Sequence, residues 1–239
     1  MDSIEKLNNI AAQIPAGRVL DVASGAGEFI HFIHEFSNVE SVTALDPSEM
    51  SRKFISEQFP DVDFILGTAE NIPAEDGSFD TICMSNSLHH LSDIPTALGE
   101  LLRVLKPGGN LVINEMQRDT DDEVRRNHVR LHHWSSSLDR KFGRFHAETF
   151  DSAFIKSTIE SLNLENLIII DYEWPIENPH DEKMTSQKIA TIEKTIERLS
   201  DKPGLDDIFA EGRSIVESIK QIGYAPAPSI FIWGIKPKG

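Results

Sequence analysis

The sequence predicts an α/β fold in which a doubly wound, mostly parallel sheet of seven strands carries helices on both faces. Short apolar runs rich in β-branched residues alternate with helical patterns through the first half of the chain, which is typical of such a sheet. A turn with two glycines directly follows the first run, as expected where a strand leads into a helix beside a bound nucleotide. A helical insertion is expected before the last strand.

The elements of the first half are expected to alternate along the chain. Ile4, Leu7 and Ala11 recur at helical spacing, so the chain opens with a helix. A Lys-Pro-Gly-Gly break at 106–109 ends a later helix and turns the chain into the next strand. Buried strands are predicted at 18–22, 41–46, 62–66, 81–85 and 110–115, with helices between them such as 48–59 and 93–105.

The second half is expected to add one helix, two strands and the insertion. A helix is predicted at 151–162, a strand at 167–174 and the last strand at 229–236. The insertion, 175–228, carries two apolar helical stripes, which an isolated helix pair cannot bury. We therefore interpret residues 1–239 as a single domain in which 175–228 forms either a cap beside the substrate opening or a dimer contact, so a homodimer is an open alternative.

Composition narrows the class of protein. The chain has 239 residues and a formal net charge of -16, which disfavours DNA or RNA as a partner. No apolar run approaches the roughly 20 residues that span a bilayer, and the N-terminus shows no export signal. The single cysteine, Cys83, is expected to be a small buried residue, which suits a reducing compartment. These features predict a cytoplasmic protein with a small-molecule partner.

The turn after the first strand predicts a nucleoside site. Asp21 ends the strand, Gly25 and Gly27 follow, and Ile30 stands where a dinucleotide motif has its third glycine. Asp46 ends the next strand about 20 residues further on, the position from which an acid reaches a ribose diol. A nucleoside without a pyrophosphate fits this pattern best.

Five segments in this order resemble the class I S-adenosylmethionine-dependent methyltransferases, and among them the branch of the ubiquinone and menaquinone C-methyltransferases (methyltransferase type 11). The resemblance covers roughly the first half of the chain and implies a Rossmann-like methyltransferase fold with S-adenosyl-L-methionine as the cofactor. The segments are VLDVASGAG at 19–27, TALDPS at 43–48, GTAENIP at 67–73, SFDTICMSNSLHHL at 78–91 and RVLKPGGNLVI at 103–113.

The resemblance also implies roles for individual residues. Asp21 would face the cofactor ammonium, Asp46 would accept both ribose hydroxyls, and Met50 would lie against the adenine unless it belongs to the core. The family's commonest first motif has glycine where this chain has Ala23, and many relatives have an acid where it has Thr68. The expected cofactor-binding residues are Asp21, Ala23, Gly25, Gly27, Asp46, Pro47, Met50, Ala69, Glu70, Ser85 and Asn86.

Histidines and a basic segment supply the candidates for the acceptor side. His89 is a candidate base, although in many relatives a histidine here orients the loop. The segment 125–146 gathers arginines and four histidines with few acids, so it is a candidate site for an acceptor bearing a carboxylate or phosphate. The competing interpretation is a solvated helix face balanced by the acids at 121–123. The candidates are His128, His132 and His133 as bases and Arg126, Arg130 and Trp134 as substrate-binding residues.

No metal site is predicted. His128 and His132 are four residues apart on an expected helix, but neither an HExxH pattern nor a cysteine ligand accompanies them. The sequence thus favours an enzyme that methylates a small-molecule acceptor, with an anionic acceptor as the specific hypothesis. The alternatives are methylation of a protein side chain and a non-catalytic module that binds S-adenosylmethionine or S-adenosylhomocysteine.

Overall fold

The computed structural model describes residues 3–238 and divides into two compact units. The sheet unit contains the described residues up to Glu115, together with 153–172 and 229–238. The helical unit contains 116–152 and 173–228. The expected insertion, 175–228, thus falls in the same unit as the basic segment at 125–146.

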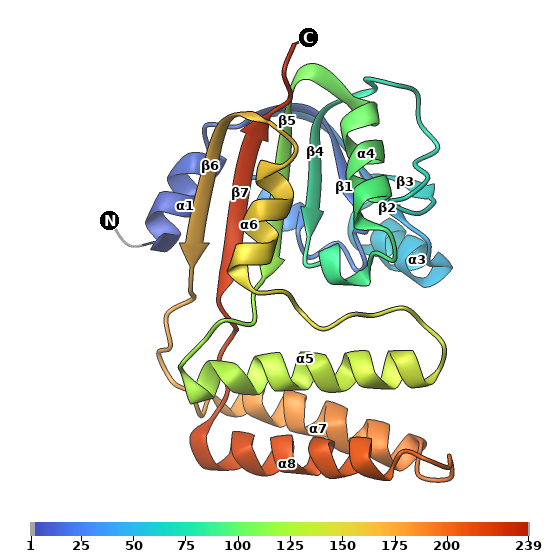
Figure 1. Ribbon diagram of the computed structural model, residues 1–239, viewed down its shortest axis with the longest axis vertical. Helices are drawn as coiled ribbons and strands as arrows, with labels where there is room; N and C mark the ends of the chain where they lie inside the picture. The colour runs from blue at the N-terminus through green and yellow to red at the C-terminus, as the bar shows by residue number, and fades with distance from the viewer. Residues whose placement is uncertain (1–2, 239) are drawn as a thin grey trace. The chain divides into compact units, whose positions relative to one another are not determined.

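The sheet unit has the predicted doubly wound sheet, with seven strands among the described residues (Figure 1). Their order across the sheet is β3-β2-β1-β4-β5-β7-β6. Neighbouring strands from β3 to β5 are parallel, whereas β6 and β7 are antiparallel. The strands are β1 (Pro15–Val22), β2 (Ser37–Asp46), β3 (Asp63–Leu66), β4 (Phe79–Ser85), β5 (Leu105–Met116), β6 (Glu165–Tyr172) and β7 (Ser229–Ile235).

Helices cover both faces of this sheet because its central strands are apolar on both sides. One face is covered by α1 (Ser3–Ala11), α2 (Ile30–Ile33) and α3 (Glu49–Gln58), whose buried residues share a core with β1, β2 and β4. The other face carries α4 (Ile94–Val104) and α6 (Ser152–Glu160) (Figure 1). Caps set the starts of two helices: Ser48 accepts the N–H groups of Met50 and Ser51, and Asp93 accepts that of Thr96. The predicted helices and strands of this unit are therefore confirmed.

The helical unit is built on α5 (Glu123–Lys141), α7 (Glu182–Arg198) and α8 (Asp206–Ile222). The apolar stripes of α7 and α8 pack with the apolar face of α5 in one buried cluster. Trp134 of α5 is 3% exposed and its indole N–H donates to the Ile208 carbonyl at 2.7 Å. A Cβ at Gly212 of α8 would lie 2.9 Å from that indole nitrogen, so glycine permits the close approach.

This packing names the partner of the apolar stripes. The stripes of 175–228 were expected to bury against the rest of the domain or a second copy, and α5, which lies outside 175–228, covers them. The cap and the dimer contact both stay predictions. No helix in the described part of the chain is long and apolar enough to cross a membrane.

Candidate functional site

A cavity of about 470 Å³ lies at the carboxyl ends of β1, β2 and β4, entirely within the sheet unit. This is the edge where a doubly wound sheet binds its ligand, because the strand order reverses there. Side chains from three strand ends and the turns after them form its walls. The lining residues are Asp21, Ala23, Ser24, Gly25, Ala26, Glu28, Phe29, Asp46, Pro47, Ser85, Asn86, Ser87 and His90.

Asp21 is the most unusual group in this cavity. Its side chain is 1% exposed, and its Oδ2 has no hydrogen-bond partner among the described residues. Burial, with a further contribution from the charge of Asp46, raises the pKa of Asp21 from 3.8 to about 8. A buried carboxyl oxygen without a donor is costly and is compensated by a ligand that brings one. The cavity therefore fits a ligand with an ammonium group, as S-adenosylmethionine has.

Asp46 is held in place by backbone donors of two turns. Its Oδ2 accepts the Gly25 N–H at 2.9 Å and its Oδ1 accepts the Ser48 N–H at 2.9 Å. The side chain is 8% exposed, and each oxygen retains acceptor capacity for a further donor. The carboxylate thus ties the turn after β1 to the start of α3 and remains able to accept hydroxyls.

The two glycines of the turn have different roles. Gly25 has φ +51 and borders the cavity, and a Cβ there would meet nothing within 4 Å, so it is the backbone conformation that favours glycine. Gly27 has φ +80 and is not among the lining residues. A Cβ at Gly27 would lie 2.8 Å from Cε2 of Phe59, at the end of α3. The structure therefore gives Gly27 a packing role, and its ligand contact stays a prediction.

Ala23 lines the cavity in a conformation that favours glycine. Its φ is +55, where an L residue is strained by roughly 1–2 kcal/mol. This is the position at which the family's commonest motif has glycine. Asn86, after β4, also has positive φ, at +49, and its N–H donates to the Asn114 carbonyl at 2.7 Å. Strained backbone thus lies at two turns of the same cavity, as is frequent at binding sites.

The remaining predicted cofactor residues divide into two groups. Pro47, Ser85 and Asn86 line the cavity, whereas three others do not. Met50 projects into solvent with 80% exposure, and Ala69 is buried. Glu70 accepts hydrogen bonds from the N–H and hydroxyl of Ser92, both at 3.3 Å, so it holds the start of the loop before α4.

A buried carboxylate at the end of β5, Glu115, organises the loop after β4. Its Oε2 accepts the N–H groups of Ser87 and Leu88 at 2.9 and 3.1 Å, and its Oε1 lies 2.6 Å from Nδ1 of His89. Both His89 and Glu115 have 0% exposure. Of the adjacent histidines, His90 lines the cavity and His89 does not. Glu115 was missed at first, although an acid at the end of an apolar strand is the signal that singled out Asp21.

The candidate substrate residues have partners within the helical unit. Arg126 bonds Glu123 and the Thr120 carbonyl, and Arg130 bonds Glu211 of α8 at 2.9 Å. One acid close in sequence, Glu123, and one distant acid, Glu211, thus accompany a segment that looked poor in acids. Trp134, predicted as either an acceptor-pocket wall or a core residue, belongs to the core of this unit.

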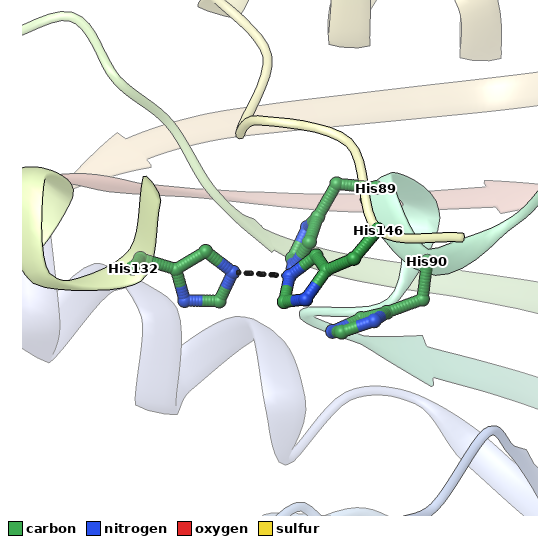
Figure 2. Close-up of side chains that lie close together, drawn as sticks. All are labelled: His89, His90, His132 and His146. Carbon is green, nitrogen blue, oxygen red and sulfur yellow. Dashed lines mark hydrogen bonds between the residues drawn. The ribbon is translucent and has the colours of Figure 1, made fainter. Parts of the chain in front are cut away.

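The candidate bases of α5 are also engaged. Nδ1 of His128 accepts the Ala227 N–H at 2.9 Å. Burial, with a smaller effect of Lys188, lowers the pKa of His128 to about 4, so this ring is a weak base at neutral pH. Nε2 of His133 is 2.9 Å from the Thr149 hydroxyl, and Nε2 of His132 is 3.1 Å from Nε2 of His146 (Figure 2). His128 and His132 therefore do not form the pair that their spacing suggested.

Comparisons with known proteins agree with this geometry. Residues 20–113, which include the end of β1, all of β2, β3 and β4 and most of β5, match the family model described as "Methyltransferase domain". The chain carries a methyltransferase domain. S-adenosylmethionine is the cofactor that such a domain implies, and the Asp21 side chain fits its ammonium group.

The curated relatives named here are similar to less than half of this chain. The demethylmenaquinone methyltransferase of Renibacterium salmoninarum is 40% identical over 107 residues, 45% of this chain and 44% of that protein. The ubiquinone/menaquinone biosynthesis C-methyltransferase UbiE of Campylobacter jejuni is 32% identical over 106 residues, 42% of this chain and 45% of that protein. The chain thus matches less than half the length of these relatives.

Solved structures share the fold along nearly the whole chain. The YcgJ protein of Bacillus subtilis has a TM-score of 0.58 and 21% identity, covering 99% of each chain. The [4+2]-cyclase SpnF has a TM-score of 0.63 and 19% identity, covering 98% of this chain and 81% of that one. At these identities the likeness concerns the fold alone. Because one neighbour is named as a cyclase, the reaction must be argued from the site.

Proposed function

We propose that this protein transfers a methyl group from S-adenosylmethionine to a small-molecule acceptor. The observation that carries the proposal is the unpartnered Oδ2 of Asp21, buried in the cavity of the methyltransferase domain. Asp46 supports it, since its fixed carboxylate lies in the same cavity with acceptor capacity for the ribose hydroxyls. S-adenosylmethionine supplies an electrophilic methyl on a sulfonium with a good leaving group.

The protein's contribution to this reaction is alignment and exclusion of water, which together lower the barrier by several kcal/mol. Asp21 and Asp46 would fix the cofactor at its two ends. Ser85 and Asn86, at the end of β4, would then lie beside the transferred methyl. The loop that holds Ser87 and His89 is anchored by Glu115, so this wall is rigid before any ligand binds.

The acceptor is proposed as a small molecule of the quinone type. The curated relatives named above are menaquinone and ubiquinone methyltransferases, which makes a demethylated quinone the first acceptor to test. An anionic acceptor stays a prediction, and it would have to compete with Glu123 and Glu211 for Arg126 and Arg130.

Calorimetry tests the cofactor part of the proposal. We expect S-adenosylmethionine and S-adenosylhomocysteine to bind the full chain and NAD not to compete. Tighter binding of NAD would contradict it. Asp21→Asn should weaken this binding. Glu35→Gln, at an exposed acid outside the cavity, is the matched control for the loss of an acidic charge in that variant.

Transfer of labelled methyl from S-adenosylmethionine tests the reaction. Label in a demethylated quinone supports the proposal. Label in added polypeptide would favour a protein methyltransferase. Tight cofactor binding without transfer to any acceptor class would favour a non-catalytic binding module.

A further inference from the structure

We propose that the helical unit binds a divalent transition-metal ion through the imidazoles of His132 and His146. Neither histidine lines the cofactor cavity, and the proposal does not depend on the proposed methyl transfer. It rests on three features of residues 132–146: the distance between two ring nitrogens, the carboxylate behind one ring, and the backbone that holds both.

The two ring nitrogens have the separation that one shared ion requires. Nε2 of His132 lies 3.1 Å from Nε2 of His146, and the rings meet at their nitrogen edges (Figure 2). Two imidazole nitrogens bound to one Zn²⁺ at about 2.0–2.1 Å with tetrahedral geometry lie roughly 3.3 Å apart. Binding an ion would widen this separation by about 0.2 Å and tilt both rings, so that the two lone pairs point at the ion.

Asp139 fixes the orientation of the second ring. Its Oδ2 lies 2.7 Å from Nδ1 of His146, while its Oδ1 accepts Nε of Arg144 at 3.0 Å. The same carboxylate forms an ion pair with the Arg144 guanidinium. An ionised carboxylate only accepts, which places the proton of His146 on Nδ1 and leaves the Nε2 lone pair toward His132. Carboxylate, histidine and ion in this order are the usual arrangement behind a metal-binding imidazole.

The backbone that carries these residues is tightly held. After α5 the chain reverses at Gly143, with φ +77, and the Arg144 N–H donates to the Asp139 carbonyl at 2.9 Å. Nη1 of Arg140 then donates to the His146 carbonyl at 2.7 Å. His146 is 4% exposed. The turn thus presents His146 to the α5 face that carries His132 before any ion arrives, which lowers the entropic cost of binding.

The chemistry of the donors selects the ion. Two neutral imidazoles suit Zn²⁺, Cu²⁺ and Ni²⁺ better than Ca²⁺ or Mg²⁺, which prefer oxygen. Two histidines leave positions on the ion for water or another ligand, unlike a closed structural site with four protein ligands. We therefore choose Zn²⁺ as the probe, with Co²⁺ as its spectroscopic substitute.

Calorimetric titration of the metal-free, tag-free full chain with Zn²⁺ tests the proposal. We expect saturable binding of one ion per chain, abolished in His132→Gln and in His146→Gln. Asp139→Asn keeps both ligands and is expected to weaken binding 10- to 100-fold, as losses of such partners do. His180→Gln, at an exposed histidine of the same unit, is the matched control and should leave binding unchanged.

Visible absorption of the Co²⁺-loaded chain provides a second readout, since nitrogen ligation gives d–d bands that both ligand variants should lose. Circular dichroism checks that each variant is folded, and the half-buried His132 keeps the test valid if His146→Gln does not fold. The proposal is overturned if Zn²⁺ does not saturate a site, or if a folded His132→Gln variant binds it as the native chain does. Either result would leave a hydrogen-bonded histidine pair without a metal. The titration contains neither S-adenosylmethionine nor an acceptor, so its failure and failure of the proposed function are separate results.

Discussion

The sheet unit and the helical unit differ in how far neighbouring residues in the sequence determine what a side chain does. In the sheet unit, Asp21 and Asp46 end adjacent strands, and the cavity lies where those strand ends meet. In the helical unit, Arg130, His133 and His128 of α5 take partners from α8, from the segment after α5 and from the segment after α8. A strand-end motif therefore predicts a site, whereas a basic helix predicts one only when its distant partners are known. Four predictions bear on this comparison.

The largest expected effect is on the core of the helical unit. Trp134→Ala should destabilise that unit by about 3–5 kcal/mol, because it empties a large buried volume and leaves the Ile208 carbonyl without its donor. Hydrogen exchange followed by mass spectrometry would show faster exchange in α5, α7 and α8. Affinity for S-adenosylmethionine should change by no more than about twofold, since every residue lining the cavity is in the sheet unit. A large loss of affinity would show that the helical unit contributes to cofactor binding, contrary to the separation of the two units drawn above.

Glu115→Gln should destabilise the sheet unit by about 1.5–3 kcal/mol, because the variant replaces the charged acceptor of Ser87, Leu88 and His89. Urea unfolding measures the change. Glu70→Gln is the matched control, since that acid also holds a loop but lies near the surface. Because its hydrogen-bond partners can bond water instead, we expect the loss in the free energy of unfolding to be under about 1 kcal/mol. Equal losses in the two variants would remove the special role of Glu115.

Asp21→Asn should weaken binding of S-adenosylmethionine about 10- to 100-fold, the value of a hydrogen bond to a charged group. The same variant should change the pH dependence of folding. Folding raises the pKa of Asp21 from 3.8 to about 8, so the unfolded chain holds fewer protons between these values and the free energy of unfolding falls as pH rises through that window.

Asp21→Asn removes that contribution, and its stability relative to the native chain should therefore increase from acidic toward alkaline pH. Urea unfolding at about pH 5 and about pH 8 compares the two proteins in this window. A constant difference between them would show that Asp21 is ionised in the folded chain at both values.

The smallest expected effect concerns Ala23. Ala23→Gly relieves the backbone strain at φ +55. The greater conformational entropy of glycine in the unfolded chain offsets part of this gain, so the sheet unit should become more stable by about 0–1 kcal/mol. Thermal unfolding measures this, with Ala26→Gly as the control in the same turn. If Ala23→Gly destabilises the chain more than the control variant does, the Ala23 methyl group adds more to the free energy of unfolding than its backbone strain removes.

The fold was predictable because buried parallel strands appear as short apolar runs. The predicted strand at 81–85 lies within β4 (Phe79–Ser85), and the predicted strand at 229–236 matches β7 (Ser229–Ile235). Asp21, Asp46, Ser85 and Asn86 were predictable for the related reason that strand ends share one edge of the sheet.

Other assignments depended on contacts that spacing does not encode. Met50 was expected against the adenine or in the core, and its 80% exposure rules out the core while the adenine contact stays a prediction. His132 was paired in the sequence with His128, four residues away, whereas the turn at Gly143 brings it His146. The acid partner of Arg130 comes from α8, 81 residues further along the chain.

The contact between Gly27 and Phe59 bears on how motifs of this kind are used as evidence. The Phe59 ring at the end of α3 packs where a Cβ of residue 27 would lie. Selection for stability alone would therefore preserve the second glycine of the turn. A descendant that had lost catalysis would keep it for as long as it kept its shape. Among homologues, an intact glycine pair therefore indicates a shared architecture, and under the proposed function retention of Asp21 is the better marker for continued binding of the cofactor.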